Sequence, residues 1–571
     1  MNGRRAVRAR LPNVGAYKFL TMTNFCAATS RWIERCSLTN ADACAALTTA
    51  TPDQLGAAAL CVDAKWCYAK RVLRAWDSAA KMVETHCREA IPYFARWERT
   101  TNIFFENLPA GFDAPGEWLY DAAGGKVRYR PLPGEDMKTA VVIAPVSKLS
   151  RLVEVKGDPD AGKIVRNVSF NRIEFAFSDV SDSLASTDKG PVELIQYQAA
   201  FYHDGTVEVE GADGVRFVEC VFRHTGNHGL KFKNGCRNSL VRRCLFDDVG
   251  AGGVWIGADD GYVTGDEKPL RRRDVRKLAP RSTAFITVED CEIRNGGQFN
   301  PEGTGVVITH ASDCRVEHCD IHDFFYSGVS VGWTWGHTGS VAQRNTVAFN
   351  RIHDLGKGRM SDMGGVYTLG TSYGTCVSNN VIWNVLSGGY GGWGIYNDEG
   401  SEGVVMENNL VYDVDDGGYH QHYGADNLIR NNIIAFVQRL GAVRTRNDYG
   451  QGYHHGKVLS SVFFYNNIVL TKGVPLAGEG VRRSWGIWAN NLWFDCASDA
   501  KPVFDGLDWA GWTACGKETG GVYADPLFVD AEARDFRLRP ESPAFKLGFK
   551  PWDLAESGTE RQIKTQKGKS R

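Results

Sequence analysis

The chain has 571 residues, enough for one long domain with an added module. Its 66 lysines and arginines almost balance 67 aspartates and glutamates, so no overall charge would attract nucleic acid or an anionic membrane. No apolar run is long enough to span a bilayer. We therefore expect neither nucleic acid nor a membrane as a partner, and the composition leaves the oligomeric state open.

Residues 1–135 precede the clear repeats, and we expect them to form an N-terminal β-rich region. The opening residues, MNGRRAVRARLPN, lack the apolar core of a signal peptide. An insertion at about residues 24–98 is rich in cysteine, and its pattern predicts no particular fold. The even number of cysteines suggests disulfides and an oxidising compartment, so we expect an extracellular or periplasmic location. These cysteines are Cys26, Cys36, Cys44, Cys61, Cys67 and Cys87.

Residues 136–549 carry a short motif that recurs ten times. Each copy has an apolar residue, two variable residues, a Cys or Asn, and a second apolar residue two places later. The Cys or Asn positions are Cys220, Cys244, Cys291, Cys319, Asn350, Asn380, Asn409, Asn432, Asn467 and Asn491. Most gaps are 23 to 35 residues, which is the period of a solenoid and is too short for a pair of helices. The repeat predicts an all-β fold, a right-handed parallel β-helix.

Stacking explains why one position keeps the same residue type. Each rung buries its inward side chains only against the rungs above and below it, so equivalent positions become ladders along the axis. Asn side chains in such a ladder can bond each other and the backbone. The four ladder cysteines have neither the spacing nor the His partners of a zinc site, and we expect small buried side chains without disulfides.

The two ends of the stack are also predicted. Asn171, flanked by Val168 and Ile173, fits the motif and is expected to be the first rung. The segment at residues 525–545 is expected to cover the other end. Residues 550–571 are polar and basic, and we expect a solvated tail.

A second ladder, of glycines, indicates where a binding site would lie. A Gly opens a strand nine residues after the Cys or Asn in the short rungs, but 14 or 15 residues after it in three others. Those three rungs therefore carry insertions at one corner, around GGQFNPEGT, GKGRMSDMG and SGGYGGW. Loops on a rigid scaffold are where binding and catalysis concentrate.

In the strands after these glycines, alternate residues are expected to point outward. The GAVRTRN rung needs a shift of one residue, since Arg444 would otherwise be buried unpaired. Amide, charged and aromatic groups suit a sugar. Trp333, Trp335 and His337 are either a stacking platform or a loop packed on its own scaffold. The expected carbohydrate-binding residues are Trp255, Trp333, Tyr367, Tyr396, His420, His422, Arg444 and Arg446.

Carboxylates beside this row could hydrolyse a glycosidic bond. Such chemistry needs two carboxyl groups, separated by roughly 5 Å for retention or 6.5–9.5 Å for inversion. The spacing does not choose between pairs, and no ligand cluster indicates a metal or another cofactor, so we expect none. The candidates are Glu302, Asp362, Asp398 and Glu399.

Four segments resemble the right-handed parallel β-helix glycoside hydrolases, most closely family 141 and more distantly family 120. They are NGRRAVRARLPN (2–13), APGEWLYD (114–121), SDMGGVYTLG (361–370) and IYNDEGS (395–401). The resemblance covers most of the chain except about 24–98. It implies that Asp362 and Asp398 are the catalytic pair, with Glu399 as an alternative second partner. It also implies a fucosidase, xylanase or xylosidase type of activity on a plant-type or microbial glycan.

Two other classes fit the same architecture. A polysaccharide lyase would use Arg444, Arg446 or Lys231 to neutralise a uronate, commonly with Ca²⁺, although no acidic cluster is spaced for that ion. A glycan-binding β-helix without catalysis would show the same polar and aromatic surface, but its activity would depend on no carboxylate pair.

Overall fold

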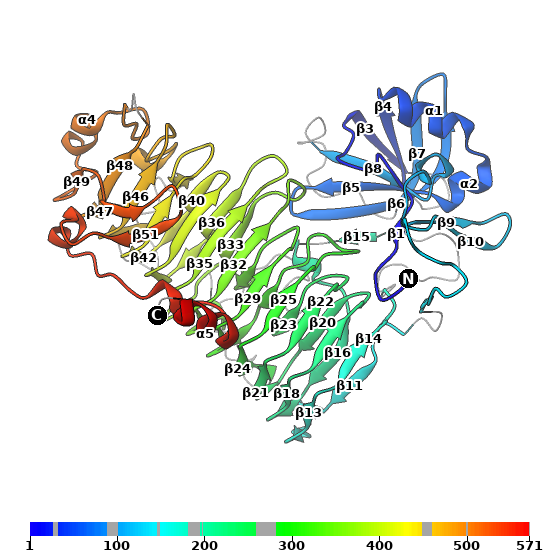
Figure 1. Ribbon diagram of the computed structural model, residues 1–571, viewed down its shortest axis with the longest axis horizontal. Helices are drawn as coiled ribbons and strands as arrows, with labels where there is room; N and C mark the ends of the chain where they lie inside the picture. Colours follow the sequence, from blue (N-terminus) through cyan, green and yellow to red (C-terminus); the bar gives the residue numbers. More distant parts are fainter. Residues whose placement is uncertain are drawn as a thin grey trace.

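The computed structural model describes residues 1–26, 32–87, 101–145, 149–180, 194–196, 198–258, 281–337, 339–447, 460–497 and 501–569. Three parallel sheets run side by side along one axis, and consecutive strands of each sheet come from successive rungs (Figure 1). This is the predicted parallel β-helix. None of its described helices is long and apolar enough to cross a membrane.

Sheet 1 has ten strands and carries the glycine ladder. In order they are β11 (Val153–Lys156), β16 (Gly205–Glu210), β20 (His228–Phe232), β23 (Val254–Ile256), β26 (Val306–Ile308), β30 (Val329–Val331), β33 (Met363–Thr368), β36 (Gly392–Asn397), β40 (Gly417–His422) and β44 (Val443–Arg446).

Sheet 2 precedes the Cys and Asn positions. Its main path is β12 (Val165–Arg166), β17 (Ala212–Asp213), β21 (Arg237–Arg242), β24 (Thr283–Glu289), β28 (Arg315–Glu317), β31 (Thr346–Ala348), β34 (Cys376–Ser378), β38 (Val405–Glu407), β42 (Asn427–Arg430), β45 (Val462–Tyr465) and β47 (Ile487–Ala489). Three short strands join beside it: β13 (Ser169–Asn171), β18 (Arg216–Val218) and β27 (Ala311–Ser312).

Sheet 3 follows the Cys and Asn positions. Its strands are β14 (Glu174–Ala176), β19 (Val221–Arg223), β22 (Leu245–Asp247), β25 (Glu292–Arg294), β29 (Asp320–His322), β32 (Arg351–Leu355), β35 (Val381–Val385), β39 (Leu410–Val414), β43 (Ile433–Ala435), β46 (Ile468–Thr471), β48 (Leu492–Asp495) and β49 (Val522–Tyr523).

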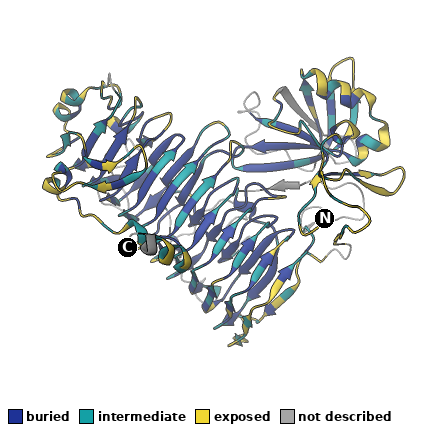
Figure 2. Cartoon of the chain, in the orientation of Figure 1, coloured by how far each residue is buried: buried dark blue, intermediate teal, exposed yellow. Residues whose placement is uncertain are grey.

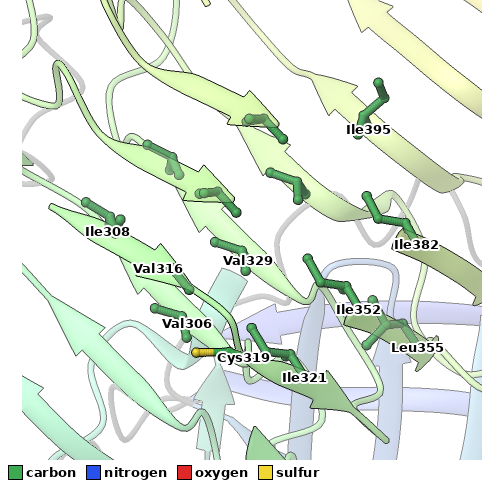
Figure 3. Close-up of a cluster of buried hydrophobic side chains, with 14 of the residues drawn as sticks. Val306, Ile308, Val316, Cys319, Ile321, Val329, Ile352, Leu355, Ile382 and Ile395 are labelled. Atoms are coloured by element: carbon green, nitrogen blue, oxygen red, sulfur yellow. The ribbon is translucent and has the colours of Figure 1, made fainter. Parts of the chain in front are cut away.

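Each glycine of the ladder is required by close packing in the core. A Cβ on Gly365 would lie 2.4 Å from Cγ2 of Ile382, and one on Gly394 would lie 2.2 Å from Cγ1 of Val411. These apolar side chains follow the Asn of the next rung, so the two ladders of the sequence meet inside the β-helix. Figure 3 shows this packing, with Ile352, Ile382 and Ile395 turned into the same interior as Cys319.

The predicted Cys and Asn ladder is present. The backbone N–H of Cys244 donates to Sγ of Cys291 at 3.4 Å, and the backbone N–H of Cys319 donates to Oδ1 of Asn350 at 2.9 Å. From Asn350 onward each side-chain amide donates to Oδ1 of the next Asn. These bonds are Asn350 to Asn380 at 2.9 Å, Asn380 to Asn409 at 3.0 Å, Asn409 to Asn432 at 3.0 Å, Asn432 to Asn467 at 3.0 Å and Asn467 to Asn491 at 3.1 Å.

The first rung differs from the prediction. Phe170 pairs with Phe217 and Phe175 pairs with Phe222, so Ile173, and not Asn171, stands opposite Cys220. Stacked phenylalanine rings set this register, with centroids 4.8 Å apart for Phe170 and Phe217. The motif spacing around Asn171 is therefore coincidental, because ring packing decides the alignment there.

The N-terminal region folds as an antiparallel sheet with two short helices. The helices are α1 (Ala41–Thr49) and α2 (Pro52–Ala57). The sheet order is β2 (Arg10–Leu11), β8 (Asn102–Glu106), β5 (Ala59–Ala64), β6 (Cys67–Asp77), β7 (Met82–Cys87), β4 (Trp32–Leu38) and β3 (Phe19–Cys26), with β15 (Leu194–Gln196) beside β6. A small sheet of β1 (Val7–Arg8), β9 (Glu117–Asp121) and β10 (Lys126–Tyr129) adjoins it.

The expected disulfides are not found among the described thiols of this region. Cys36, Cys44, Cys61 and Cys67 are all free. Three of them are buried, and Cys36 and Cys67 pack in the apolar core of the N-terminal sheet. Burial of small side chains accounts for Cys36, Cys61 and Cys67, and the side chains of Cys26 and Cys87 lie outside the described residues.

The N-terminal sheet is joined to the β-helix by its β5–β6 hairpin (Figure 1). Nε of Arg359, in an inserted loop, lies 2.9 Å from both carboxylate oxygens of Asp63. The backbone N–H of Ser361 donates to the carbonyl of Lys65 at 3.0 Å. The hairpin turn is therefore fixed beside the loop that carries Asp362.

The C-terminal segment covers one end and one side of the stack. It contains α4 (Trp509–Ala514), the hairpin of β50 (Phe528–Asp530) and β51 (Asp535–Leu538), and α5 (Glu560–Lys569). The tail is not simply solvated, since Ser557 is fully buried and its hydroxyl donates to the carbonyl of Asn379 at 2.7 Å. Figure 2 shows the β-helix strands mostly buried and the tail mostly exposed or half-buried.

Candidate active site

Asp362 and Asp398 lie beside neighbouring strands of sheet 1. Asp362 immediately precedes β33 and has a left-handed backbone, with φ of 57°. Its N–H donates to the carbonyl of Tyr390 at 3.0 Å, which ties it to the loop before β36. A Cβ on Gly391 would lie 2.5 Å from the Asp362 Cα, so this approach requires glycine. Two inserted loops thus place Asp362 over the strand that leads to Asp398.

One phenol connects the two carboxyl groups. The hydroxyl of Tyr396 lies 3.2 Å from Oδ1 of Asp362 and 2.8 Å from Oδ1 of Asp398. The distance between the two Oδ1 atoms therefore cannot exceed the combined length of these two hydrogen bonds. This is the close pairing of the aspartates that the sequence alone did not decide.

Asp398 is held by three side chains. It accepts from the hydroxyl of Tyr367 at 2.6 Å and from the hydroxyl of Tyr396, and its Oδ1 lies 3.0 Å from Nδ1 of His422. Burial opposes the charged form of His422, but its hydrogen bond to Asp398 and the charge of Asp398 outweigh burial and raise the pKa of His422. The arrangement orients Asp398 as a charged carboxylate facing an imidazole.

Asp362 is half-buried and surrounded by neutral donors. Its carboxylate accepts from Nε1 of Trp393 and from the hydroxyls of Tyr390 and Tyr396, each at 3.2 Å. Burial, followed by the nearby charge of Asp398, raises the pKa of Asp362 to about 6. A carboxyl group in this range can hold a proton in mildly acidic solution.

The predicted outward row is confirmed by the strand register. Tyr367 pairs with Tyr396, Tyr396 with His420, and His420 with Arg444. The shift of one residue in the last rung is present, because Val443 pairs with Tyr419 and Arg446 with His422. These side chains form one continuous surface outside the β-helix core, beside the two aspartates, and Tyr367, Tyr396 and His420 are almost completely buried in it.

His420 and Trp393 form the apolar side of this surface. Their rings stack with centroids 4.0 Å apart and an angle of 18°. The guanidinium carbon of Arg444 lies 5.8 Å from the Trp393 ring centre. Burial, then the positive charge of Arg444, lowers the pKa of His420 well below its ordinary value, which keeps this imidazole neutral.

Glu399 and Glu302 have different surroundings from the pair. Glu399 accepts from the hydroxyl of Tyr423 at 2.9 Å and lies 3.9 Å from Nδ1 of His422, so it borders the site. Glu302 is fully buried and neither of its oxygens has a hydrogen-bond partner. Burial raises the pKa of Glu302 well above its usual range. No described contact connects Glu302 with Asp362 or Asp398.

Five other residues that the sequence singled out do not lie at the pair. Trp255 and Trp333 are buried in a cluster with Phe201, whose ring stacks on Trp333 with centroids 5.0 Å apart. The ammonium of Lys231 donates to the carbonyl of His203 at 2.7 Å and is almost completely buried. His337 lies 3.5 Å from Glu402. Of this group only Trp335 is substantially exposed.

Several site residues were not predicted. Tyr390 and Trp393 belong to the SGGYGGW insertion, and its aromatic residues were the available signal. Tyr326 donates to the backbone carbonyl of Asp362 at 3.1 Å. The ammonium of Lys65 lies 5.7 Å from the centre of the Tyr390 ring, so the N-terminal hairpin forms part of the site wall.

Comparisons with known proteins agree on the architecture. The family model described as "Right handed beta helix region" matches residues 278–478. A search of the curated proteins found no match.

Three solved structures illustrate the likeness. A structure named "Glycoside hydrolase" is 23% identical, with 76% of each chain covered and a TM-score of 0.61. The GH136 lacto-N-biosidase from Eubacterium ramulus is 8% identical over 65% of this chain and 59% of that chain, with a TM-score of 0.36. Pectate lyase Pel9A is 14% identical over 67% and 92%, with a TM-score of 0.34. The family match and the first of these structures establish the right-handed parallel β-helix fold of this chain.

Proposed function

We propose that this protein is a glycoside hydrolase in which Asp362 and Asp398 form the catalytic pair. The observation that carries the proposal is the single Tyr396 hydroxyl within hydrogen-bond distance of both carboxylates, at 3.2 and 2.8 Å. Two carboxyl groups in different environments are what glycosidic bond cleavage requires.

The different surroundings of Asp362 and Asp398 support different roles in the reaction. Asp362, with its pKa raised to about 6, donates a proton to the leaving oxygen. Asp398, oriented by Tyr367, Tyr396 and His422, attacks the anomeric carbon and forms a glycosyl ester as the bond to the leaving oxygen breaks. Water then attacks the same anomeric carbon, Asp362 takes a proton from that water, and the bond from the anomeric carbon to Asp398 breaks to release the carboxylate.

The close pairing supports retention of configuration. Retaining enzymes hold their carboxyl groups about 5–5.5 Å apart, whereas inverting enzymes need about 6.5–9.5 Å to admit a water molecule. Two oxygens within reach of one phenol match the shorter range better.

The substrate class rests on the surface and on the resemblance. Arg444 and the exposed Arg446, in the rung after His420, offer donors to the substituents of a sugar. With the resemblance to β-helix glycosidases, this supports a plant-type or microbial glycan and an activity of the fucosidase, xylanase or xylosidase type. An extracellular or periplasmic location belongs to the same proposal.

A panel of chromogenic glycosides and plant-wall oligosaccharides tests the function. Release of reducing sugar from at least one substrate is expected, and proton NMR of the first product should show the anomer of the substrate. With Asp398→Gly and added azide, the expected product is a glycosyl azide of inverted configuration. Glu399→Gln should remain active in the same assay. Loss of activity in Glu399→Gln alone would transfer the second role to Glu399.

Two outcomes would replace this proposal. Products that absorb as unsaturated uronates would identify a lyase, which would abstract a proton and need no glycosyl ester. Tight oligosaccharide binding with no product from any substrate, unchanged in Asp362→Asn, would identify a glycan-binding protein.

A further inference from the structure

A cluster on sheet 3 combines two imidazoles and a carboxylate outside the candidate active site. Asp320 and His322 belong to β29, and His353 belongs to the next strand, β32. The register pairs His322 with His353, so both rings project from the same outward column. One atom from each residue can be chosen so that all three lie within 4.8 Å of one another.

The carboxylate already lies close to one imidazole. Nε2 of His353 is 3.1 Å from Oδ1 of Asp320. The ring of His322 stacks on that of His353, with centroids 4.7 Å apart and an angle of 4°. Oε1 of Glu292, on the preceding strand, is 3.9 Å from Nε2 of His322 and is a further oxygen within reach. The three residues thus bring one possible ligand atom each to within 4.8 Å of the others, from parallel stacked rings.

Each imidazole is oriented by a second carboxylate. Nδ1 of His322 lies 2.8 Å from Asp323, and Nδ1 of His353 lies 2.7 Å from Asp354. Asp323 is itself 2.7 Å from the ammonium of Lys357. Histidines that bind metals almost always donate their other N–H to a carboxylate or carbonyl, which fixes the tautomer and leaves the second nitrogen as a ligand. The same device occurs here twice, in adjacent rungs.

The surroundings shield the cluster from water. Asp320 is buried, and the side chains of His322 and His353 are only 15% and 14% exposed. Trp383 stacks on His353 with ring centroids 4.0 Å apart. The amide of Gln562, in α5, donates to Oδ2 of Asp320. The C-terminal helix therefore covers the carboxylate on the side away from the imidazoles.

We propose that Asp320, His322 and His353 bind one divalent transition-metal ion of the zinc class at a structural site. Two imidazole nitrogens and one carboxylate oxygen suit zinc and its neighbours, whereas Ca²⁺ and Mg²⁺ prefer oxygen alone. Zinc holds nitrogen at about 2.0–2.1 Å, so binding tilts the two stacked rings toward each other. The ion joins two rungs of the β-helix and, through Asp320 and Gln562, the C-terminal helix.

This site goes beyond the proposed hydrolysis and takes no part in it. Asp362 and Asp398 lie beside sheet 1, and the cluster lies on sheet 3. The expected effect of the metal is therefore on thermal stability, because an ion that binds only the folded state stabilises that state.

The test uses the full-length protein, stripped with a chelator and dialysed, then titrated with zinc chloride. One equivalent of zinc should bind, and a saturating amount should raise the melting temperature by about 2 °C or more. Cobalt(II) at the same site should give a visible absorption band. Asp320→Asn and His353→Gln should each lose the bound equivalent, the band and the thermal shift.

His318→Gln is the matched control. His318 stacks on Phe349 with ring centroids 5.0 Å apart, so it is an imidazole in a similar stack without a second imidazole. This variant should keep the full response to zinc. Glycosidase turnover of the wild type should be unchanged by stripping.

Three results would overturn the site. They are no bound zinc in the wild type, an equal zinc response in both ligand variants, or a response lost in His318→Gln as well. If both ligand variants fail to fold, two other measurements test the site. They are the zinc response of His322→Gln and the zinc content of the wild type after stripping and reloading. A folded Asp320→Asn variant lacks the proposed site. If stripping also lowered the turnover of that variant, the result would count against the metal-free mechanism of the aspartate pair.

Discussion

The early and late rungs of sheet 1 bury the same ladder positions but use them differently. Trp255 on β23 and Val307 on β26 point outward, but they are buried in a cluster with Phe201 and Trp333. Tyr367 on β33 and Tyr396 on β36 occupy equivalent positions, and their hydroxyls contact Asp398. The ladder fixes which way a side chain points. The segment that lies above it decides whether the position supports stability or chemistry.

The early and late rungs also differ in the partners of their polar side-chain atoms. Nε1 of Trp255 donates to a backbone carbonyl, that of Gly257, at 3.1 Å, so its polar atom is used locally. Tyr367 and Tyr396 extend their hydroxyls to carboxylates of the loops. Variants in the late rungs should therefore change turnover, and variants in the early rungs should change stability.

The largest effect is expected for the aspartates. Asp362→Asn and Asp398→Asn should each lower kcat by about 10²- to 10⁴-fold with the melting temperature nearly unchanged, because proton transfer and attack are lost but shape is kept. Initial rates on the best substrate and circular dichroism melting measure this. Full activity of Asp362→Asn would exclude the proposed pair.

The early rungs should respond in the opposite way. Trp255→Ala should lower the free energy of unfolding by about 3–5 kcal/mol, because it empties a packed aromatic cluster. Denaturant unfolding gives this value. The kcat of the remaining folded protein should stay near that of the wild type, and a catalytic loss without destabilisation would contradict the comparison.

Tyr396→Phe tests the shared hydroxyl. A hydrogen bond to a charged group contributes about 1.5–3 kcal/mol, so kcat/KM should fall roughly tenfold to a hundredfold. Tyr412→Phe is a suitable control, since Tyr412 lies on sheet 3, and it should leave kcat/KM unchanged. Equal effects of the two changes would show that the hydroxyl has no specific role.

The pH dependence should report Asp362. Burial and then Asp398 raise the pKa of Asp362 to about 6, and the acid acts only when it is protonated. The rate should therefore fall about tenfold per pH unit above pH 6. A titration of Asp362 by NMR in Asp398→Asn should give a lower pKa, because one cause of the increase is gone. An unchanged value would show that burial alone raises it.

The smallest effect is expected at the edge of the site. Arg444→Met should raise KM a few-fold with little change in kcat, since Arg444 lies over Trp393 and contacts neither aspartate. Arg430→Met, which breaks an ion pair with Glu407 on sheet 2, should change neither constant. A fall in kcat of Arg444→Met beyond tenfold would place this arginine in the chemistry.

Most of the rung architecture could be predicted because repetition exposes it. The Asn ladder, the glycine positions and the shift at Arg444 all follow from the need to stack equivalent residues. The first rung was wrong because stacked phenylalanines, and not the motif, align Phe170 with Phe217. The number of cysteines did not predict the state of Cys36, Cys61 and Cys67, since small buried thiols pack without a disulfide.

The candidate site could be predicted only in part. The outward row was available from strand alternation, and Asp362 and Asp398 came from the family resemblance. Lys65 and Tyr390 could not be foreseen, because their positions depend on a hairpin and a loop without a repeat. The sequence also predicted no metal ligands, since His322 and His353 are 31 residues apart and only the register makes them neighbours.

The Asn ladder has a direction, and its amide dipoles add. Each side-chain amide donates one N–H to the Asn of the next rung and the other to a backbone carbonyl of the rung before it, so the inter-Asn bonds all run toward the C-terminal end and their positive pole lies at Asn491. Glu518 faces that pole, with its Oε2 3.1 Å from the amide nitrogen of Asn491. Burial nevertheless raises the pKa of Glu518 to about 7 from 4.5. Between these values the folded chain binds more protons than the unfolded one, so the last rungs lose stability as the pH rises from about 4.5 to about 7.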